Sequence, residues 1–92
     1  MDWKNEWKKV IGKKLVIDTS TPYIYLGTLD SCDDWFITLS DVDVHDHKEG
    51  SSTKEQYIND AVKTSVKTNR KKVNIRKDQI VSFSLLEDVI VY

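Results

Sequence analysis

The chain has 92 residues, 39% of them hydrophobic and 32% charged, and this length and composition predict one small soluble domain, residues 1–92. With 14 basic against 15 acidic residues, the chain as a whole lacks the positive charge typical of proteins that bind nucleic acid through bulk electrostatics. The single cysteine, Cys32, excludes an internal disulfide and favours a reducing, cytoplasmic location.

A short amphipathic helix is predicted over residues 2–10, where Trp3, Trp7 and Val10 recur at helical spacing. Asp2 can cap its start and Gly12 can end it. Because so short a helix needs a surface to dock on, the tryptophans either cover one end of a β core or receive a partner. We expect no export signal and no membrane partner, since no apolar run approaches the length of a membrane span.

Three strands are predicted next, at residues 15–17, 23–29 and 35–44, because these segments are rich in β-branched, aromatic and aliphatic residues. A turn at residues 18–22 holds the only proline, Pro22. A polar hinge at residues 30–34 separates the second strand from the third. Gly27, inside the second strand, indicates strong bending or a close approach of two backbones.

The second half of the chain begins with a polar loop at residues 45–51, followed by a helix over residues 52–66. We expect Ser52 and Glu55 to form a capping box at its start. One face of this helix is apolar: Tyr57, Ile58, Ala61, Val62 and Val66. Two more strands, at residues 73–76 and 79–85, and an apolar tail at residues 87–92 complete the predicted elements.

This element order resembles the Sm-like family, and two segments carry the resemblance. The first is Gly27-Thr28-Leu29 with Asp33, Trp35-Phe36-Ile37 and Leu39-Ser40-Asp41; the second is Ile75-Arg76-Lys77 followed by the run from Ile80 to Leu86. The resemblance implies a mainly β fold: a five-stranded, strongly bent antiparallel small barrel of the Sm-like or SH3-like kind. An N-terminal helix precedes this barrel, and a helical insert, approximately residues 45–70, lies between its third and fourth strands.

The resemblance also implies a non-enzymatic RNA-binding protein that forms a ring. Sm-like RNA binders hold a base with an aromatic residue or histidine and an asparagine from the first segment, and with an arginine-glycine pair from the second. The corresponding residues here are Asp33, Trp35, Phe36, Arg76 and Lys77. The loop is one residue shorter, no asparagine stands near Trp35, and Lys77 replaces the glycine. Trp35 and Phe36 either stack on a base or belong to the core.

A basic stretch at residues 63–77 contains no acidic residue and includes Arg70, Lys71, Lys72, Arg76 and Lys77. It is typical of a phosphate-binding surface, and equally of a strand edge protected from aggregation by charge. Residues 28–46 are acidic by contrast, with six aspartates and no basic residue. The basic edge of one subunit can therefore face the acidic strand of the next, which favours a homo-oligomer.

Asp43, His45 and His47 alternate with Asp41 along the end of the third predicted strand and are weak candidates for metal ligands. Outward polar faces of strands alternate in the same way, so we expect no metal and no cofactor. No nucleophile, oxyanion loop or phosphate-binding glycine motif accompanies these histidines, which argues against an enzyme.

Two functions of different class remain open. The first is an Sm-like RNA-binding or ribonucleoprotein-type protein. The second is a protein-assembly module on the same barrel that has lost RNA binding and meets a protein partner through the helix at residues 52–66.

Overall fold

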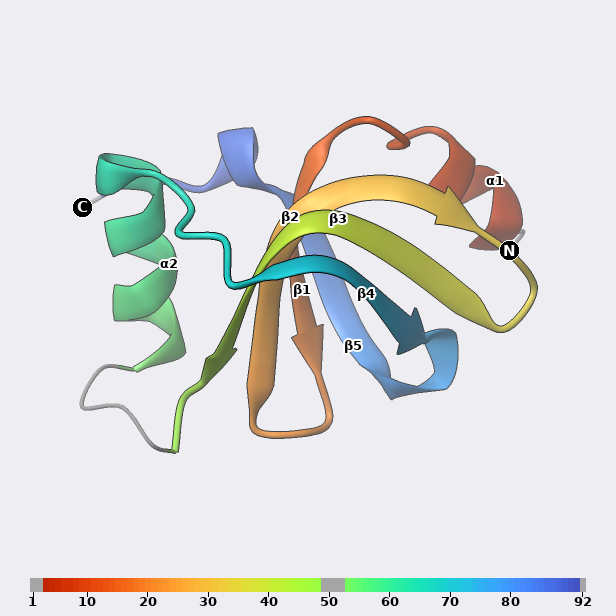
Figure 1. Ribbon diagram of the computed structural model, residues 1–92. Helices are drawn as coiled ribbons and strands as arrows, with labels where there is room; N and C mark the ends of the chain where they lie inside the picture. The colour runs from red at the N-terminus through yellow and green to blue at the C-terminus, as the bar shows by residue number, and fades with distance from the viewer. Residues whose placement is uncertain (1–2, 49–52, 92) are drawn as a thin grey trace.

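The computed structural model describes residues 3–48 and 53–91, which form one curved sheet with a helix at each end (Figure 1). The short helix α1 (Trp3–Lys8) precedes strands β1 (Lys14–Thr19), β2 (Tyr23–Cys32) and β3 (Phe36–Asp46). Helix α2 (Lys54–Thr64) then leads to β4 (Arg70–Arg76) and β5 (Ile80–Leu85). Single-turn 3₁₀ helices, Lys77–Gln79 and Leu86–Asp88, flank β5.

All strand pairs are antiparallel, and the order across the sheet is β4-β3-β2-β1-β5. The mainly β fold with five bent strands, an N-terminal helix and a helix between the third and fourth strands is therefore confirmed. The edges of the sheet are β4 and β5, whereas β2 and β3 are paired on both sides.

Several predicted boundaries were wrong. Trp35 lies in the turn before β3, and β3 continues to Asp46 instead of ending at Val44. The cap of α2 is one residue later than predicted: Thr53 accepts a hydrogen bond from the Gln56 backbone N–H, and the Gln56 side chain returns the bond. The predicted caps Asp2 and Ser52 lie outside the described residues, as does the side chain of Trp3.

The sheet is buried on both faces where β1 and β2 lie. Leu15 and Ile17 point into the barrel interior, where Trp7 of α1, 3% exposed, stacks on Phe83 with ring centroids 4.3 Å apart. Val16, between them on the strand, points to the opposite face. That outer face is covered by α2, whose residues Ile58 and Ala61 pack against Val16, Ile24 and Leu26. The insert helix thus covers the barrel, and its predicted apolar face is the face that docks.

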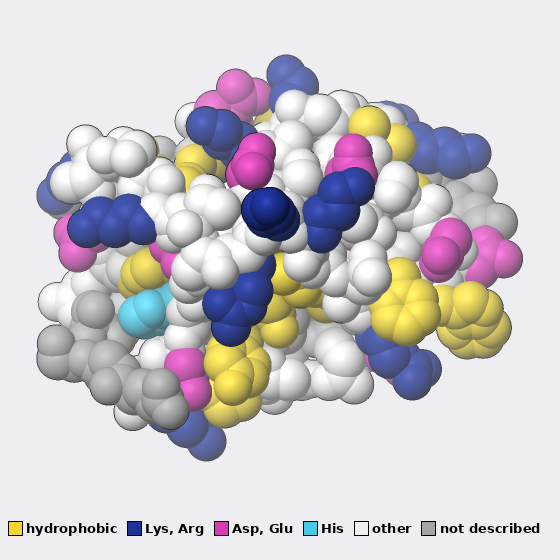
Figure 2. Space-filling model, viewed as in Figure 1, with side chains coloured by type: hydrophobic (Ala, Val, Ile, Leu, Met, Phe, Trp, Pro, Cys, Tyr) yellow, Lys and Arg dark blue, Asp and Glu magenta, His cyan; other side chains and the backbone are white. Residues whose placement is uncertain are grey.

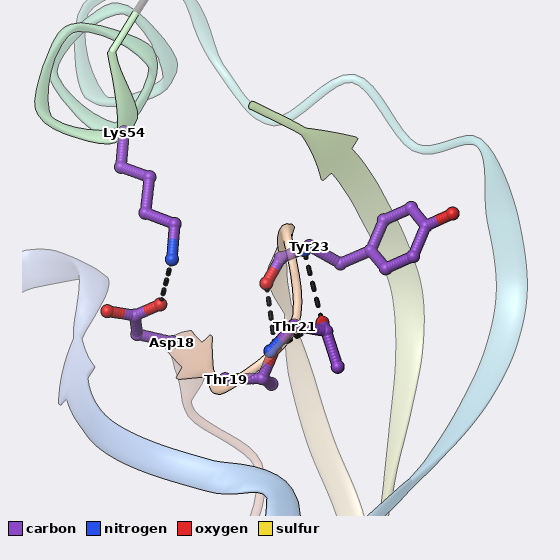
Figure 3. A network of polar contacts seen from close by, with 5 residues as sticks. All are labelled: Asp18, Thr19, Thr21, Tyr23 and Lys54. Carbon is purple, nitrogen blue, oxygen red and sulfur yellow. Dashed lines mark hydrogen bonds and ion pairs between the residues drawn. The ribbon is translucent and has the colours of Figure 1, made fainter. Parts of the chain in front are cut away.

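The start of α2 is held beside the turn between β1 and β2 (Figure 3). The Lys54 ammonium lies 2.5 Å from the carboxylate of Asp18, at the end of β1. In the turn, the buried Thr19 hydroxyl donates to the Tyr23 carbonyl at 2.9 Å, and the Tyr23 N–H donates to the Thr21 hydroxyl at 3.1 Å. These bonds satisfy polar groups that would otherwise be unpaired where strand and helix meet.

The bend of β2 and β3 centres on Gly27 and Asp41. Leu26 pairs with Asp43 and Thr28 pairs with Ser40, so Gly27 faces two residues of β3, a β-bulge. Asp41 takes the left-handed conformation, with φ of 51°. A Cβ on Gly27 would stand 3.2 Å from the Ser40 carbonyl oxygen and 3.2 Å from Val42 Cγ2. A side chain at residue 27 would therefore press against the β3 backbone and against the Val42 side chain.

We therefore expect Gly27→Ala to destabilise the protein by about 1–3 kcal/mol, as overpacking of a close contact does. Chemical denaturation monitored by circular dichroism measures this change. Thr28→Ala is the matched control, because Thr28 is only half-buried and lies next to the bulge on β2 but is not the residue opposite it. Equal free energies of unfolding for Gly27→Ala and wild type would show that β2 and β3 can move apart at the bulge without loss of stability.

Candidate nucleic-acid interface

Asp33 organises the turn between β2 and β3. Its Oδ1 accepts hydrogen bonds from the backbone N–H groups of Trp35 and Phe36, both at 2.8 Å, and its own N–H donates to the Phe36 carbonyl at 2.9 Å. The bonds from Phe36 and Trp35, followed by the charge of Lys77, lower the pKa of the Asp33 carboxyl below its usual range. The turn is therefore rigid and carries an ionised carboxylate.

Two aromatic side chains stand exposed beside this carboxylate. Trp35 is 69% exposed and Phe36 is 38% exposed, so the interpretation of both rings as core residues was wrong. The reason lies in the strand register: Ile37 and Leu39 fill the interior, which leaves Phe36 on the outward face, and Trp35 lies beyond the end of the strand.

The end of β4 brings basic residues to the same place. Phe36 pairs with Arg76 across the sheet, and the Lys77 N–H donates to the Trp35 carbonyl at 2.8 Å. Arg76 also forms an exposed ion pair with Asp78 at 2.9 Å. Figure 2 shows hydrophobic side chains exposed over the β2–β3 turn, with Lys or Arg side chains directly beside them. The structure thus brings together five of the predicted site residues: Asp33, Trp35, Phe36, Arg76 and Lys77.

The remaining basic residues of the prediction, Arg70, Lys71 and Lys72, lie apart from this group. Arg70 and Arg76 occupy opposite ends of β4, about 20 Å apart at the rise of an extended strand. Lys72 forms an exposed ion pair with Asp30 at 3.3 Å, and Arg70 donates to the Asn69 carbonyl. The basic stretch is therefore a strip along an edge strand and not one pocket.

A pocket of about 420 Å³ opens between the end of α1 and the β2–β3 turn. It is lined by Lys8, Cys32, Asp33, Asp34 and Trp35. Sequence reasoning did not connect Lys8 with this turn, because the docking of α1 on the barrel is a tertiary contact that leaves no local signal.

His45, in the histidine stretch at the end of β3, packs against α2. The His45 ring stacks on Tyr57 of α2, with centroids 3.9 Å apart and planes 7° from parallel. Asp43 accepts a hydrogen bond from the Asn69 side chain at 3.2 Å. Burial, and then the nearby Asp43 carboxylate, raise the pKa of the Tyr57 hydroxyl. Asp41 lies at the bulge and not in register with Asp43, His45 and His47; within residues 3–48 and 53–91, no three His, Cys, Asp or Glu side chains gather as metal ligands.

No protein-family model matches the chain, and no curated protein matches it in sequence. Solved structures do match. The Sm protein of Pyrococcus abyssii in complex with a uridine heptamer aligns with a TM-score of 0.60 and 14% identity, covering 88% of this chain and 93% of that one. A heptameric archaeal Sm protein aligns with a TM-score of 0.57 and 15% identity, over 88% and 96% of the two chains.

The chain has the Sm-like fold. A chain of the NatC complex bound to CoA shares it, with a TM-score of 0.57 and 16% identity over 85% of this chain and 80% of that one. Sm-like folds thus occur in an RNA complex and in a complex with protein partners. Within the described ranges, no helix is long and apolar enough to cross a membrane.

The lowered pKa of Asp33 gives a pH-dependent stability. Because the folded pKa lies below the unfolded one, the carboxylate stabilises the fold above the unfolded pKa, and this contribution is lost as the pH falls through the folded pKa. Asp33→Asn keeps an oxygen that accepts both backbone hydrogen bonds but carries no charge. We expect the melting temperature of wild type to exceed that of Asp33→Asn at pH 7, and the two melting temperatures to become equal at acid pH.

Thermal melts across a pH series measure this difference. Asp33→Ala, which has no acceptor, is expected to melt lower than wild type at every pH. If the difference in melting temperature between wild type and Asp33→Asn stays constant with pH, the charge of the Asp33 carboxylate does not stabilise this turn.

Proposed function

We propose that this protein binds single-stranded RNA as an Sm-like homo-oligomer in the cytoplasm, without catalytic activity. The observation that carries the proposal is the exposed Trp35 ring on a turn that is bonded to Lys77 and followed by the cross-strand pair of Phe36 with Arg76. An exposed aromatic ring offers a base a stacking surface, and adjacent cations contact phosphate. The uridine heptamer bound to the Pyrococcus abyssii Sm protein shows that this fold accommodates single-stranded RNA.

Each predicted site residue has a place in this proposal. Trp35 and Phe36 supply stacking surfaces, Asp33 holds the turn in shape, and Arg76 and Lys77 contact the phosphate next to the stacked base. The strip formed by Arg70, Lys71 and Lys72 extends the positive surface along β4, where the RNA backbone can follow it.

The experiment is RNA binding followed by fluorescence anisotropy. We expect Arg76→Ala with Lys77→Ala to lower the affinity about tenfold at low salt, since two phosphate contacts are lost, and to flatten the salt dependence. Trp35→Ala is expected to cost about 1–3 kcal/mol at any salt concentration, the usual value of one base stack.

The control is Lys48→Ala, which removes an exposed lysine just after the end of β3, at the opposite end of that strand from the β2–β3 turn. It is expected to bind like wild type. If RNA fails to bind at low ionic strength, or if binding is unchanged in the Arg76 and Lys77 double variant, RNA binding at this end is excluded.

The proposed oligomer uses the two edges of the sheet. The acidic residues of the 28–46 segment fall on β2, β3 and the turn between them, and both of these strands lie inside the sheet, so a basic edge cannot pair with an acidic edge. The edge opposite β4 is β5, whose six residues, IVSFSL, carry no charge. Pairing β4 of one copy with β5 of the next would satisfy the free backbone groups of both strands.

Mass measurement in solution tests this arrangement, and we expect a multiple of the 10.7 kDa protomer. Val81→Lys places a charge on β5, where the side chain is 67% exposed, and is expected to yield monomers. Ile11→Lys, which charges another exposed apolar residue off the edge, is expected to keep the wild-type mass. A wild-type monomer at high concentration would contradict the proposal.

A second candidate is a protein-assembly module, favoured by the likeness to a chain of the NatC complex. Exposed apolar residues outside the RNA interface, such as Val81 and Ile90, suit a protein partner. Helix α2 contributes only its outward polar face to such a contact, because Ile58 and Ala61 already pack on the sheet. An oligomer that binds no RNA would favour this candidate.

A further inference from the structure

The pocket beside Trp35 has an unusual chemical lining for a uracil-binding site. The polar residues that line it are Asp33, Asp34, Lys8 and Cys32, and among the side chains that the structure describes no asparagine or glutamine lines it. An amide offers one donor and one acceptor side by side, whereas a carboxylate only accepts. The lining therefore favours a base edge that presents donors to a carboxylate.

Asp33 is positioned to accept hydrogen bonds from a base. Two backbone N–H groups bond to Oδ1 and hold this oxygen against the turn, which restricts the carboxylate. Among the described residues, no hydrogen bond reaches Oδ2, which leaves this oxygen available to a ligand. A fixed carboxylate discriminates between donors better than a mobile one, because little ordering is needed when the ligand binds.

The four bases differ in what they present to such an acceptor. Guanine carries two adjacent donors, N1–H and N2–H₂, on its Watson–Crick edge, and the acceptors O6 and N7 lie beside them. Uracil carries a single N3–H between two carbonyl oxygens, which a carboxylate repels. Lysine is a common partner of guanine O6 and N7, and Lys8 lines the same pocket. A purine also covers more of the Trp35 indole than a pyrimidine does.

We propose that the pocket formed by Lys8, Asp33 and Trp35 selects guanine over uracil in single-stranded RNA. The Asp33 carboxylate accepts from guanine N1–H and N2–H₂, Lys8 donates to O6 or N7, and Trp35 stacks on the base. This specificity rests on the RNA binding proposed above and adds to it the identity of the base.

The test compares labelled RNA heptamers of sequence CACXCAC, in which X is G, A, C or U, by fluorescence anisotropy with the 92-residue chain. We expect the X = G heptamer to bind about tenfold more tightly than X = U, the discrimination typical of one good base contact. Trp35→Phe, which keeps a smaller ring, is expected to weaken all four while preserving their order.

Asp33→Asn decides the role of the carboxylate. The asparagine keeps the oxygen that accepts both backbone hydrogen bonds, so the turn is retained, and it adds an N–H donor where the carboxylate had an acceptor. We expect the preference for guanine to disappear or to shift towards uracil. Asp30→Asn removes the same charge from the same hairpin without touching the pocket, and it is expected to keep the wild-type order of bases.

The outcomes separate the two proposals. If none of the heptamers binds, the proposed function itself fails. If they bind equally, or if X = U binds best, the guanine assignment is overturned while RNA binding stands. A wild-type preference for guanine that survives in Asp33→Asn would overturn the role of the carboxylate. The wild-type comparison alone suffices if Asp33→Asn does not fold.

Discussion

The contact between β2 and β3 at Gly27 is the constraint on which the rest of the structure depends. The β-bulge opposite it inserts Asp41 into β3 and reverses which side chains point inward. Before the bulge Ile37 and Leu39 face the interior; after it Val42 does. If Asp41 were an ordinary strand residue and not part of a bulge, Asp41 and Asp43 would point inward and Val42 outward. The bulge therefore keeps the barrel interior apolar and the sheet curved at once.

The same reversal attaches the insert helix. It places His45 on the outer face of the sheet, where its ring stacks on Tyr57, and it brings Asp43 to the Asn69 side chain that closes the loop after α2. The helix covers Val16, Ile24 and Leu26, which are as apolar as the interior residues between them. In so small a domain, a second apolar layer adds buried area that the barrel alone cannot provide.

The fold could be predicted from the sequence because its signals are local. Apolar and aromatic runs mark the strands, Gly27 marks the bend, and the apolar spacing of Tyr57 to Val66 marks the helix. The bulge also leaves a signal in the sequence: the apolar residues Ile37, Leu39, Val42 and Val44 are separated by two, three and two positions, and the interval of three departs from strand alternation.

The candidate site was predictable only in part, because it is assembled from three elements. The resemblance to the Sm-like family located Asp33 and Arg76, because each lies in one of the two short segments that carry this resemblance. The exposure of Trp35 depends on the residue at which β3 begins. Residue preferences for strands do not locate the end of a strand to within one residue. Lys8 enters through the docking of α1 by Trp7, a contact between residues 76 positions apart in the Trp7–Phe83 stack. Tertiary packing of this kind has no sequence pattern of its own.

The charges around the β2–β3 turn decide which RNA contacts this end of the molecule can support. Arg76, beside the turn, already has an exposed ion pair with Asp78, and Lys72, farther along β4, has one with Asp30. Such pairs stabilise a fold by only about 0–1 kcal/mol, so an RNA phosphate can easily replace the carboxylate as the partner of the cation. The displaced carboxylate stays close to the phosphate, however, and repels it. Attraction of the RNA backbone is therefore modest here. Beside the phosphate contacts of Arg76 and Lys77, an RNA bound at this end would depend on stacking on Trp35 and on hydrogen bonds to a base edge, contacts that salt screens weakly and that distinguish one base from another.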